Sequence, residues 1–133
     1  MGTEQVVCDT DVIIDYWNAN NQRHTFTQHI LENLIGLDNV IISAMTKMEL
    51  LVGANNKEDL KTIDKKLHRL NISLIDEGVS SIALQLLQDY NLSHGLAIPD
   101  AIIAATAINA NLRLFTHNIK DYKFITQLSL YKK

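Results

Sequence analysis

Four carboxylate side chains lie next to apolar stretches of this sequence, where an unpaired charge is costly. They are Asp9, Glu49, Asp100 and Asp121. Ionised acids beside a protein core are rare unless they are paired or bind a metal. If the four converge, each pair about 4 Å apart repels by about 4 kcal/mol at an effective dielectric constant of about 20. A divalent cation would remove that repulsion, so the pattern predicts a metal site.

The donor atoms of these side chains are all oxygens, which favours a hard ion such as Mg²⁺ or Mn²⁺ over Zn²⁺. A carboxylate-bound magnesium beside a phosphodiester generates a hydroxide nucleophile and stabilises the leaving oxygen. This is hydrolysis without a covalent intermediate. The sequence offers no Ser-His-Asp or Cys-His arrangement as a rival, and its five histidines show no paired metal spacing.

Short β-branched runs alternate with segments of helical periodicity along the chain. The predicted strands cover residues 4–8, 40–42, 72–75 and 112–115, and the predicted helices cover 12–17, 26–37, 45–52, 57–70, 79–90 and 101–108. This alternation predicts an α/β fold, with a central parallel sheet of four or five strands flanked by helices on both faces. Ligands of such sheets bind beyond the carboxyl ends of the strands. Asp9 follows the first predicted strand, and 116–121 follow the last.

The composition is that of an ordinary globular protein. With 133 residues, 47% hydrophobic and 20% charged, we expect a single domain over residues 1–133. No run of about 18 apolar residues predicts a membrane span, and 1–10 lack the pattern of a secretory signal. The lone Cys8 indicates a reducing compartment, so we expect a cytoplasmic protein. The net charge of −3 would become +1 with two divalent ions, which is compatible with an RNA partner but does not favour one.

Four motifs occur together in a fixed order: CDTDVIIDYW, SAMTKMELLVGA, IPDAIIAATAI and LFTHNIKDYKFI. In order and spacing they resemble the PIN-domain family, and in particular the VapC toxins of prokaryotic toxin–antitoxin pairs. The resemblance extends from about Val6 to Ile125. It implies a PIN-like fold for the whole domain.

The resemblance also assigns roles to individual residues. It implies that Asp9, Glu49, Asp100 and Asp121 are the metal-binding and catalytic acids. It implies a supporting function for Ser43, Thr116 and Asn118, and we expect Thr10 and Asp11, next to Asp9 at the start of a helix, to support the site as well. The implied activity is metal-dependent endoribonuclease cleavage of tRNA or rRNA. The implied partners are a VapB-like antitoxin and a second copy of the chain, in a homodimer.

Three positions depart from the common pattern of that family. Asp11 stands where asparagine is common and makes a fifth acid. His117 stands where arginine is common, and Tyr122 where phenylalanine is common. None of these departures removes a proposed metal ligand.

Simpler interpretations of these residues remain open at the level of sequence. Asp9 and Asp100 could be helix caps, Glu49 a solvated helix residue, and Asp121 an ordinary loop acid. Thr10 and Ser43 could also be caps. The basic helix face from Lys57 to Arg69 is either a solvated surface or a track for RNA. The aromatic residues Tyr16, Trp17 and Phe26 belong either to the core or to a dimer or antitoxin contact.

Two rival functions also remain open. One is a PIN-like nucleic-acid-binding module or housekeeping nuclease without a toxin role. The other is a haloacid-dehalogenase-type phosphatase, in which Asp9 of the Asp9-Thr10-Asp11 step would be a covalent nucleophile. That family needs a later lysine and an acidic pair beyond a strand, and no acidic pair here suits that place.

Overall fold

The structure is a computed structural model that describes residues 4–132. Four strands form one parallel sheet in the order β3-β2-β1-β4. They are β1 (Val6–Cys8), β2 (Val40–Ser43), β3 (Asn71–Ser73) and β4 (Arg113–Phe115). The predicted α/β class and parallel sheet are confirmed, with four strands.

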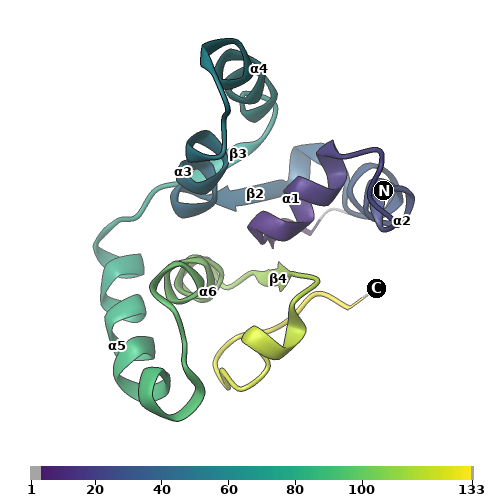
Figure 1. Ribbon diagram of the computed structural model, residues 1–133. Helices are drawn as coiled ribbons and strands as arrows, with labels where there is room; N and C mark the ends of the chain where they lie inside the picture. Colours follow the sequence, from purple (N-terminus) through teal and green to yellow (C-terminus); the bar gives the residue numbers. More distant parts are fainter. Residues whose placement is uncertain (1–3, 133) are drawn as a thin grey trace.

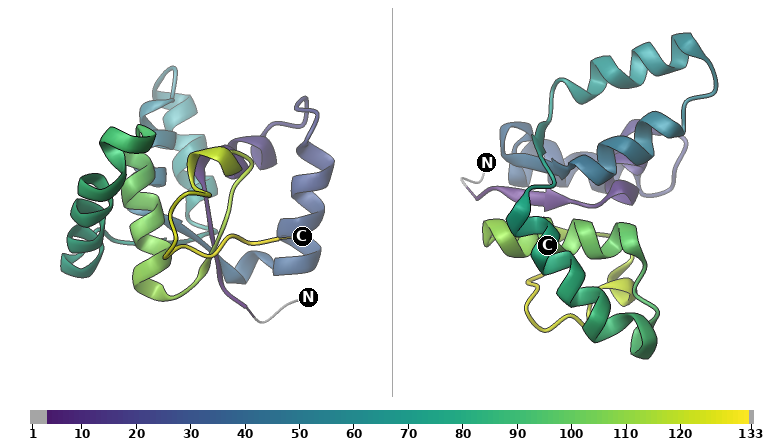
Figure 2. Two further views of the ribbon diagram at one scale, coloured as in Figure 1. Left: turned by 90° about the horizontal axis from the view of Figure 1, so that it is seen from below. Right: turned by 90° about the vertical axis from the view of Figure 1, so that its left-hand side faces the viewer.

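Helices cover both faces of this sheet (Figures 1 and 2). On one side lie α5 (Glu77–His94) and α6 (Ile98–Ala110), which pack against each other and against β1 and β4. The other side carries α1 (Thr10–Trp17), α2 (His24–His29), α3 (Ala44–Val52) and α4 (Lys57–Leu67). Two apolar cores result, one on each face. None of the helices within residues 4–132 combines the length and apolar character needed to cross a membrane.

The strands end at slightly different residues from the predicted ones, and for the third strand the cause is its pairing with β2. The third strand was predicted over 72–75, but β3 ends at Ser73. Ser73 pairs with Ser43, the last residue of β2, and beyond it the chain of β2 turns into α3. With no partner left to pair with, β3 ends there.

Two helices differ clearly from the prediction, one in its type of helix and the other in the residue at which it begins. The helix expected over 26–37 is α2 followed by a π-helical segment, Ile30–Ile35, which ends where Gly36 takes φ 89°. A short 3₁₀ turn, Leu37–Asn39, then leads into β2. Helix α6 begins at Ile98, before the predicted 101, because Pro99 lies in the first turn, where its missing N–H has no helical acceptor to lose.

The last part of the chain returns to the sheet. Leu114 of β4 donates its N–H to the carbonyl of Ser129 at 2.9 Å and accepts from the N–H of Tyr131 at 2.8 Å. A 3₁₀ turn, η3 (Ile119–Asp121), lies between β4 and this tail. The tail therefore covers the backbone edge of β4 that would otherwise be open.

Candidate active site

The site is built where the parallel strands end. Asp9 directly follows β1, Ser43 ends β2, and Thr116 directly follows β4. Asp9 is the N-cap of α1 and accepts from the backbone N–H of Thr10, while Ser43 is the N-cap of α3 and accepts from that of Met45. Both helices therefore start at the same edge of the sheet, each with a polar side chain at its first turn.

Asp9 is a buried carboxylate held by two hydrogen bonds. Its side chain is 5% exposed, Oδ1 accepts from the N–H of Thr10 at 2.8 Å, and Oδ2 accepts from Oγ1 of Thr116 at 2.8 Å. Burial, followed by the charge of Asp11, raises the pKa of Asp9 to about 6. Asp9 thus does cap a helix, as one interpretation of the sequence had it. The same carboxylate also carries a charge whose burial is unfavourable.

Asp100 lies in the first turn of α6, where Ala97 is the N-cap, so it is not the cap of this helix. Burial and then the charges of Asp9, Asp121 and Glu49 raise the pKa of Asp100 to about 6, against a hydrogen bond from Tyr122 that lowers it. The four predicted acids come from four separate segments of the chain. The structure brings the other three near enough to Asp100 for their charges to act on it.

Glu49 projects from α3 and is exposed, but it is tied to α1. The hydroxyl of Thr10 lies 2.7 Å from Oε1 of Glu49 and 2.9 Å from Oγ1 of Thr46. Because Thr46 is one helical turn before Glu49, both side chains face α1. Thr10 therefore connects the start of α1 to the acid of α3.

The segment after β4 supports Asp9 and carries the fourth acid. The hydroxyl of Thr116 donates to Asp9 and accepts from the N–H of Asn118 at 3.0 Å. Asp121 ends η3 and is exposed, close enough to Asp100 to raise its pKa. The Thr-x-Asn step is thus a short hydrogen-bonded turn that fixes one oxygen of Asp9.

The charge of this cluster has no cationic partner in the part of the chain that the structure describes. The ion pairs within residues 4–132 join Arg23 to Asp15 and Arg113 to Glu4, the nearby His117 contacts Asp15, and none of these contacts involves the four acids. Nor are any three His, Cys, Asp or Glu side chains in this range already arranged as a ready ligand set.

One carboxylate oxygen beside the cluster has no hydrogen-bond donor among the described residues. Oδ1 of Asp11 is buried without a hydrogen-bond partner among the described residues, while its Oδ2 accepts from the N–H of His117 at 3.0 Å. Uncompensated negative charge and a buried oxygen without a donor fit a divalent cation in chemical terms. Small side-chain movements would have to complete its ligand set.

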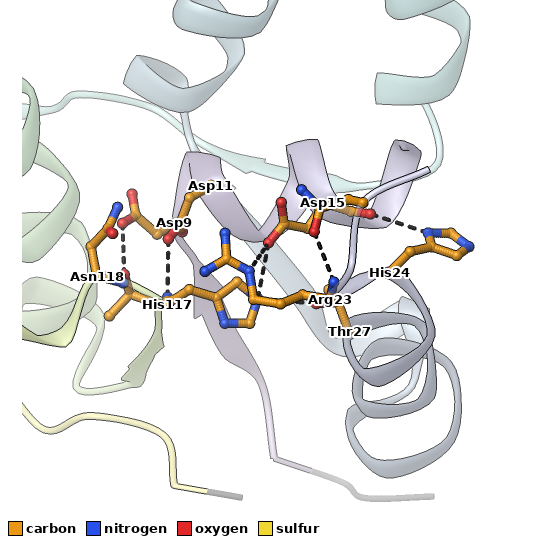
Figure 3. Close-up of polar contacts among 10 residues, drawn as sticks. Asp9, Asp11, Asp15, Arg23, His24, Thr27, His117 and Asn118 are labelled. Atoms are coloured by element: carbon orange, nitrogen blue, oxygen red, sulfur yellow. Dashed lines mark hydrogen bonds and ion pairs between the residues drawn. The ribbon is translucent and has the colours of Figure 1, made fainter. Parts of the chain in front are cut away.

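A second polar network lies next to the acids, on the same side of α1 (Figure 3). Asp15, one turn after Asp11, is buried and accepts from the guanidinium of Arg23 at 2.7 Å. Nε2 of His117 lies 3.0 Å from the hydroxyl of Thr27 and 3.5 Å from Oδ2 of Asp15. Burial and the charge of Arg23 lower the pKa of His117. The imidazole is therefore neutral near pH 7, and Arg23 supplies the fixed positive charge.

Sequence reasoning assigned no function to several of these residues. Thr46, Asp15, Arg23 and Thr27 were not singled out, and Tyr122 was noted only as a departure from the family pattern. The spacing of Asp15 four residues after Asp11, and of Thr46 three before Glu49, was an available signal. Arg23 and Thr27 gave no such signal, because their partners lie in other segments.

The structure is an α/β protein with a cluster of acids at one edge of its parallel sheet, and comparison with known proteins gives the family. Residues 6–124 match the PIN domain. The chain belongs to the PIN-domain family, as the four motifs predicted. This membership replaces the haloacid-dehalogenase alternative. No curated protein sequence matches the chain.

Several solved structures share the fold over nearly the whole chain. A toxin–antitoxin complex from Klebsiella pneumoniae is 28% identical, with a TM-score of 0.75, covering 97% of this chain and 100% of that one. VapBC2 from Rickettsia felis, bound to a DNA fragment from its promoter, is 26% identical, with a TM-score of 0.74 and coverages of 95% and 96%. FitAcB from Neisseria gonorrhoeae is 25% identical, with a TM-score of 0.72 and coverages of 96% and 97%.

Proposed function

We propose that this chain is a metal-dependent endoribonuclease of the VapC toxin type, with Mg²⁺ or Mn²⁺ bound by Asp9, Glu49, Asp100 and Asp121. The observation that carries the proposal is the cluster itself. Acids from three other segments act on Asp100, and no ion pair among residues 4–132 offsets the charge of the four. Membership of the PIN-domain family supports a nuclease.

The proposed chemistry divides between the ion and the side chains. When bound, the ion supplies a water of lowered pKa and a positive charge beside the phosphate. The four acids would hold it. Thr10 keeps Glu49 turned toward α1, and Thr116 fixes one oxygen of Asp9. These hydrogen bonds reduce the freedom that the carboxylates must lose when they bind the ion.

The proposed substrate is cellular RNA, with tRNA or rRNA as the expected targets. The basic residues of α4 and of the turn after it are our candidate for contact with the phosphate backbone: Lys57, Lys61, Lys65 and Lys66 in the helix, and Arg69 in the turn. Contacts of this kind make binding weaken as salt concentration rises. An RNA substrate also agrees with the expected cytoplasmic location.

The proposed protein partner is a VapB-like antitoxin, as in the complexes of the solved neighbours. A pocket of about 270 Å³ is our candidate for part of its contact surface. Its lining includes Tyr16, Trp17, Leu37, Lys66 and Leu70. We also propose a homodimer, for which the exposed apolar residues Leu84 and Leu92 of α5 are candidate contacts.

The test is cleavage of total cellular RNA by purified protein, with the new ends mapped by sequencing. We expect cleavage with Mg²⁺ or Mn²⁺, loss of cleavage in excess chelator, and a loss of at least a hundredfold in Glu49→Gln and Asp100→Asn. Glu58→Gln, an exposed acid in the first turn of α4, is the matched control and should cleave normally. Cleavage that persists in excess chelator would contradict the mechanism.

A second arm addresses the toxin role. Expression of the wild-type chain alone should arrest growth, and co-expression of the adjacent small gene should restore it. RNA cleavage without growth arrest would indicate a housekeeping nuclease. Protein that is inert on RNA, yet binds DNA together with the adjacent gene product, would indicate the binding-module alternative.

A further inference from the structure

The hydroxyl of Tyr122 lies at the centre of the acidic cluster, although its ring belongs to the core. Tyr122 follows η3 directly, is 1% exposed, and packs into the apolar core on the α5 and α6 side. Its hydroxyl donates to Oδ1 of Asp100 at 3.1 Å. It also lies close enough to the carboxylate of Asp9 to oppose the rise in that group's pKa.

A phenylalanine would fill the same space in the core, so packing does not explain the oxygen. A buried hydroxyl is costly unless it has a hydrogen-bond partner. Here its hydrogen-bond partner is the carboxylate of Asp100, in the first turn of α6, and the charge of Asp9, at the start of α1, also acts on it. Among residues 4–132, Tyr122 is the one side chain that donates a hydrogen bond to Asp100.

We propose that Tyr122 is a positioning residue for the metal site, and that its hydroxyl holds the carboxylates of Asp9 and Asp100 together so that their remaining oxygens are available to one ion. This inference rests on the proposed function. Asp9 is already held on its other side by Thr10 and Thr116. Asp100 lacks such support, so the hydroxyl matters most for the orientation of Asp100.

The Tyr122 hydroxyl orients the carboxylates mainly in the metal-free protein. A single O–H donor between two like charges offsets part of their repulsion and limits the rotation of both side chains. Without it, Asp100 would be free to turn toward solvent, and binding the ion would have to restore its orientation. Partners that orient metal ligands typically change metal affinity by about tenfold to a hundredfold when they are removed.

The experiment compares Mn²⁺ affinity, measured by calorimetry and by the loss of the free Mn²⁺ EPR signal, in three variants and the wild type. Tyr122→Phe should bind Mn²⁺ at least tenfold more weakly, while circular dichroism shows a folded protein. Tyr90→Phe, which removes a hydroxyl hydrogen-bonded to Gln127 on the surface, should bind as the wild type does. Asp100→Asn should lose measurable binding.

Failure of this inference is distinguishable from failure of the proposed function. If the wild type binds Mn²⁺, Asp100→Asn does not, and Tyr122→Phe binds as well as the wild type, only the role of Tyr122 is overturned. If the wild type itself fails to bind at millimolar Mn²⁺, both the metal site and the role of Tyr122 are overturned.

A measurement on the wild-type protein covers the case in which Tyr122→Phe does not fold. With ¹³C at the Cζ atom of tyrosine, the four tyrosines give four signals, which Phe variants at Tyr16, Tyr90 and Tyr131 assign by elimination. Addition of Mg²⁺ should shift the Tyr122 signal and leave that of Tyr90 in place. A Tyr122 signal that is unchanged at saturating Mg²⁺ would overturn the proposal.

Discussion

Asp9 combines a structural and an electrostatic role in one side chain. It caps α1 through the N–H of Thr10, and it carries a buried charge beside Asp11. Asparagine caps helices about as well as aspartate does. Replacing Asp9 by asparagine therefore removes the charge while retaining the cap, which separates the two roles.

The raised pKa of Asp9 makes the metal-free protein sensitive to pH. The folded protein favours the neutral carboxyl of Asp9 more than the unfolded chain does. The neutral carboxyl therefore adds to the free energy of unfolding at low pH, and this contribution is lost as the pH rises from about 4 to about 6. We expect the loss to be on the order of 2 kcal/mol. Asp9→Asn should flatten the pH dependence and unfold at higher urea than the wild type at pH 7.

Urea denaturation in the presence of chelator, at pH 4.5 and pH 7, measures this effect. Asp76→Asn is the matched control, because Asp76 likewise caps a helix, α5, but lies outside the acidic cluster. Equal pH dependence in the wild type and Asp9→Asn would contradict the electrostatic account of this site.

At the scale of single residues, the sequence predicted the acids better than their partners. Asp9 and Asp100 stand out because they interrupt apolar runs, and a buried charge requires an explanation. The hydroxyl of Tyr122 does not stand out, since a tyrosine in an apolar segment is typical of a core. Its importance depends on two carboxylates that come from distant parts of the chain.

An ion pair with a buried carboxylate joins α1 to the start of α2, and a neutral histidine joins both helices to the loop after β4. The side chain of Asp15 is 4% exposed and that of Arg23 is 51% exposed, so the burial cost falls almost entirely on the carboxylate. His117 reaches Asp15 and Thr27 from that loop, and its own N–H is bonded to Asp11. A movement of α2 would therefore displace His117 and, with it, the loop after β4 that supports Asp9.

Removal of the arginine should destabilise this junction. Arg23→Met leaves a buried carboxylate without its main partner, and we expect a loss of about 2–3 kcal/mol of unfolding free energy, reduced by the partial exposure of Arg23. The double variant Asp15→Asn with Arg23→Met should recover part of this loss. Urea denaturation at pH 7 measures both, and equal stability of Arg23→Met and the wild type would contradict this role of the pair.

At the scale of elements, periodicity predicted where helices and strands occur but not how they end. The amphipathic pattern of α4 and the β-branched runs of β1 and β2 are local properties of the sequence. The π-helical turn at Ile30–Ile35 and the early end of β3 are not. The end of β3 depends on the position of its partner strand, which no local pattern encodes.

Seen as a whole, the molecule has one sheet edge covered by its own tail. Beyond the hydrogen bonds between Leu114 and the tail, the ring of Tyr131 packs against Phe115, and the guanidinium of Arg113 lies 4.8 Å from the ring centre of Tyr131. The sequence predicts no helix or strand after residue 115. The tail is held by the backbone bonds of Leu114 and by a few side-chain contacts without helical or strand spacing, so no periodic pattern in the sequence reveals it.

Removal of this tail should destabilise the fold. Deletion of residues 126–133 leaves two backbone groups of Leu114 unpaired and exposes Phe115, for an expected loss of about 2–4 kcal/mol. Thermal melting with light scattering measures both the loss and any association through the opened edge. Deletion of 132–133 alone is the control and should have little effect. If the variant lacking 126–133 melts at the same temperature as the full-length protein, the tail does not stabilise the fold in this way.

The order of strands in the sheet has a consequence for the way the protein is made. Of the four strands, the interior strand β1 is made first, and translation must also pass its neighbour β4 and the acid Asp121 before the site can form. Until then Asp9 lacks the hydroxyl of Thr116, and the cluster lacks a member. A partly made chain that has not yet reached β4 and η3 therefore lacks the full set of acids that we propose to bind the ion, so the proposed activity cannot appear before these elements have folded onto β1.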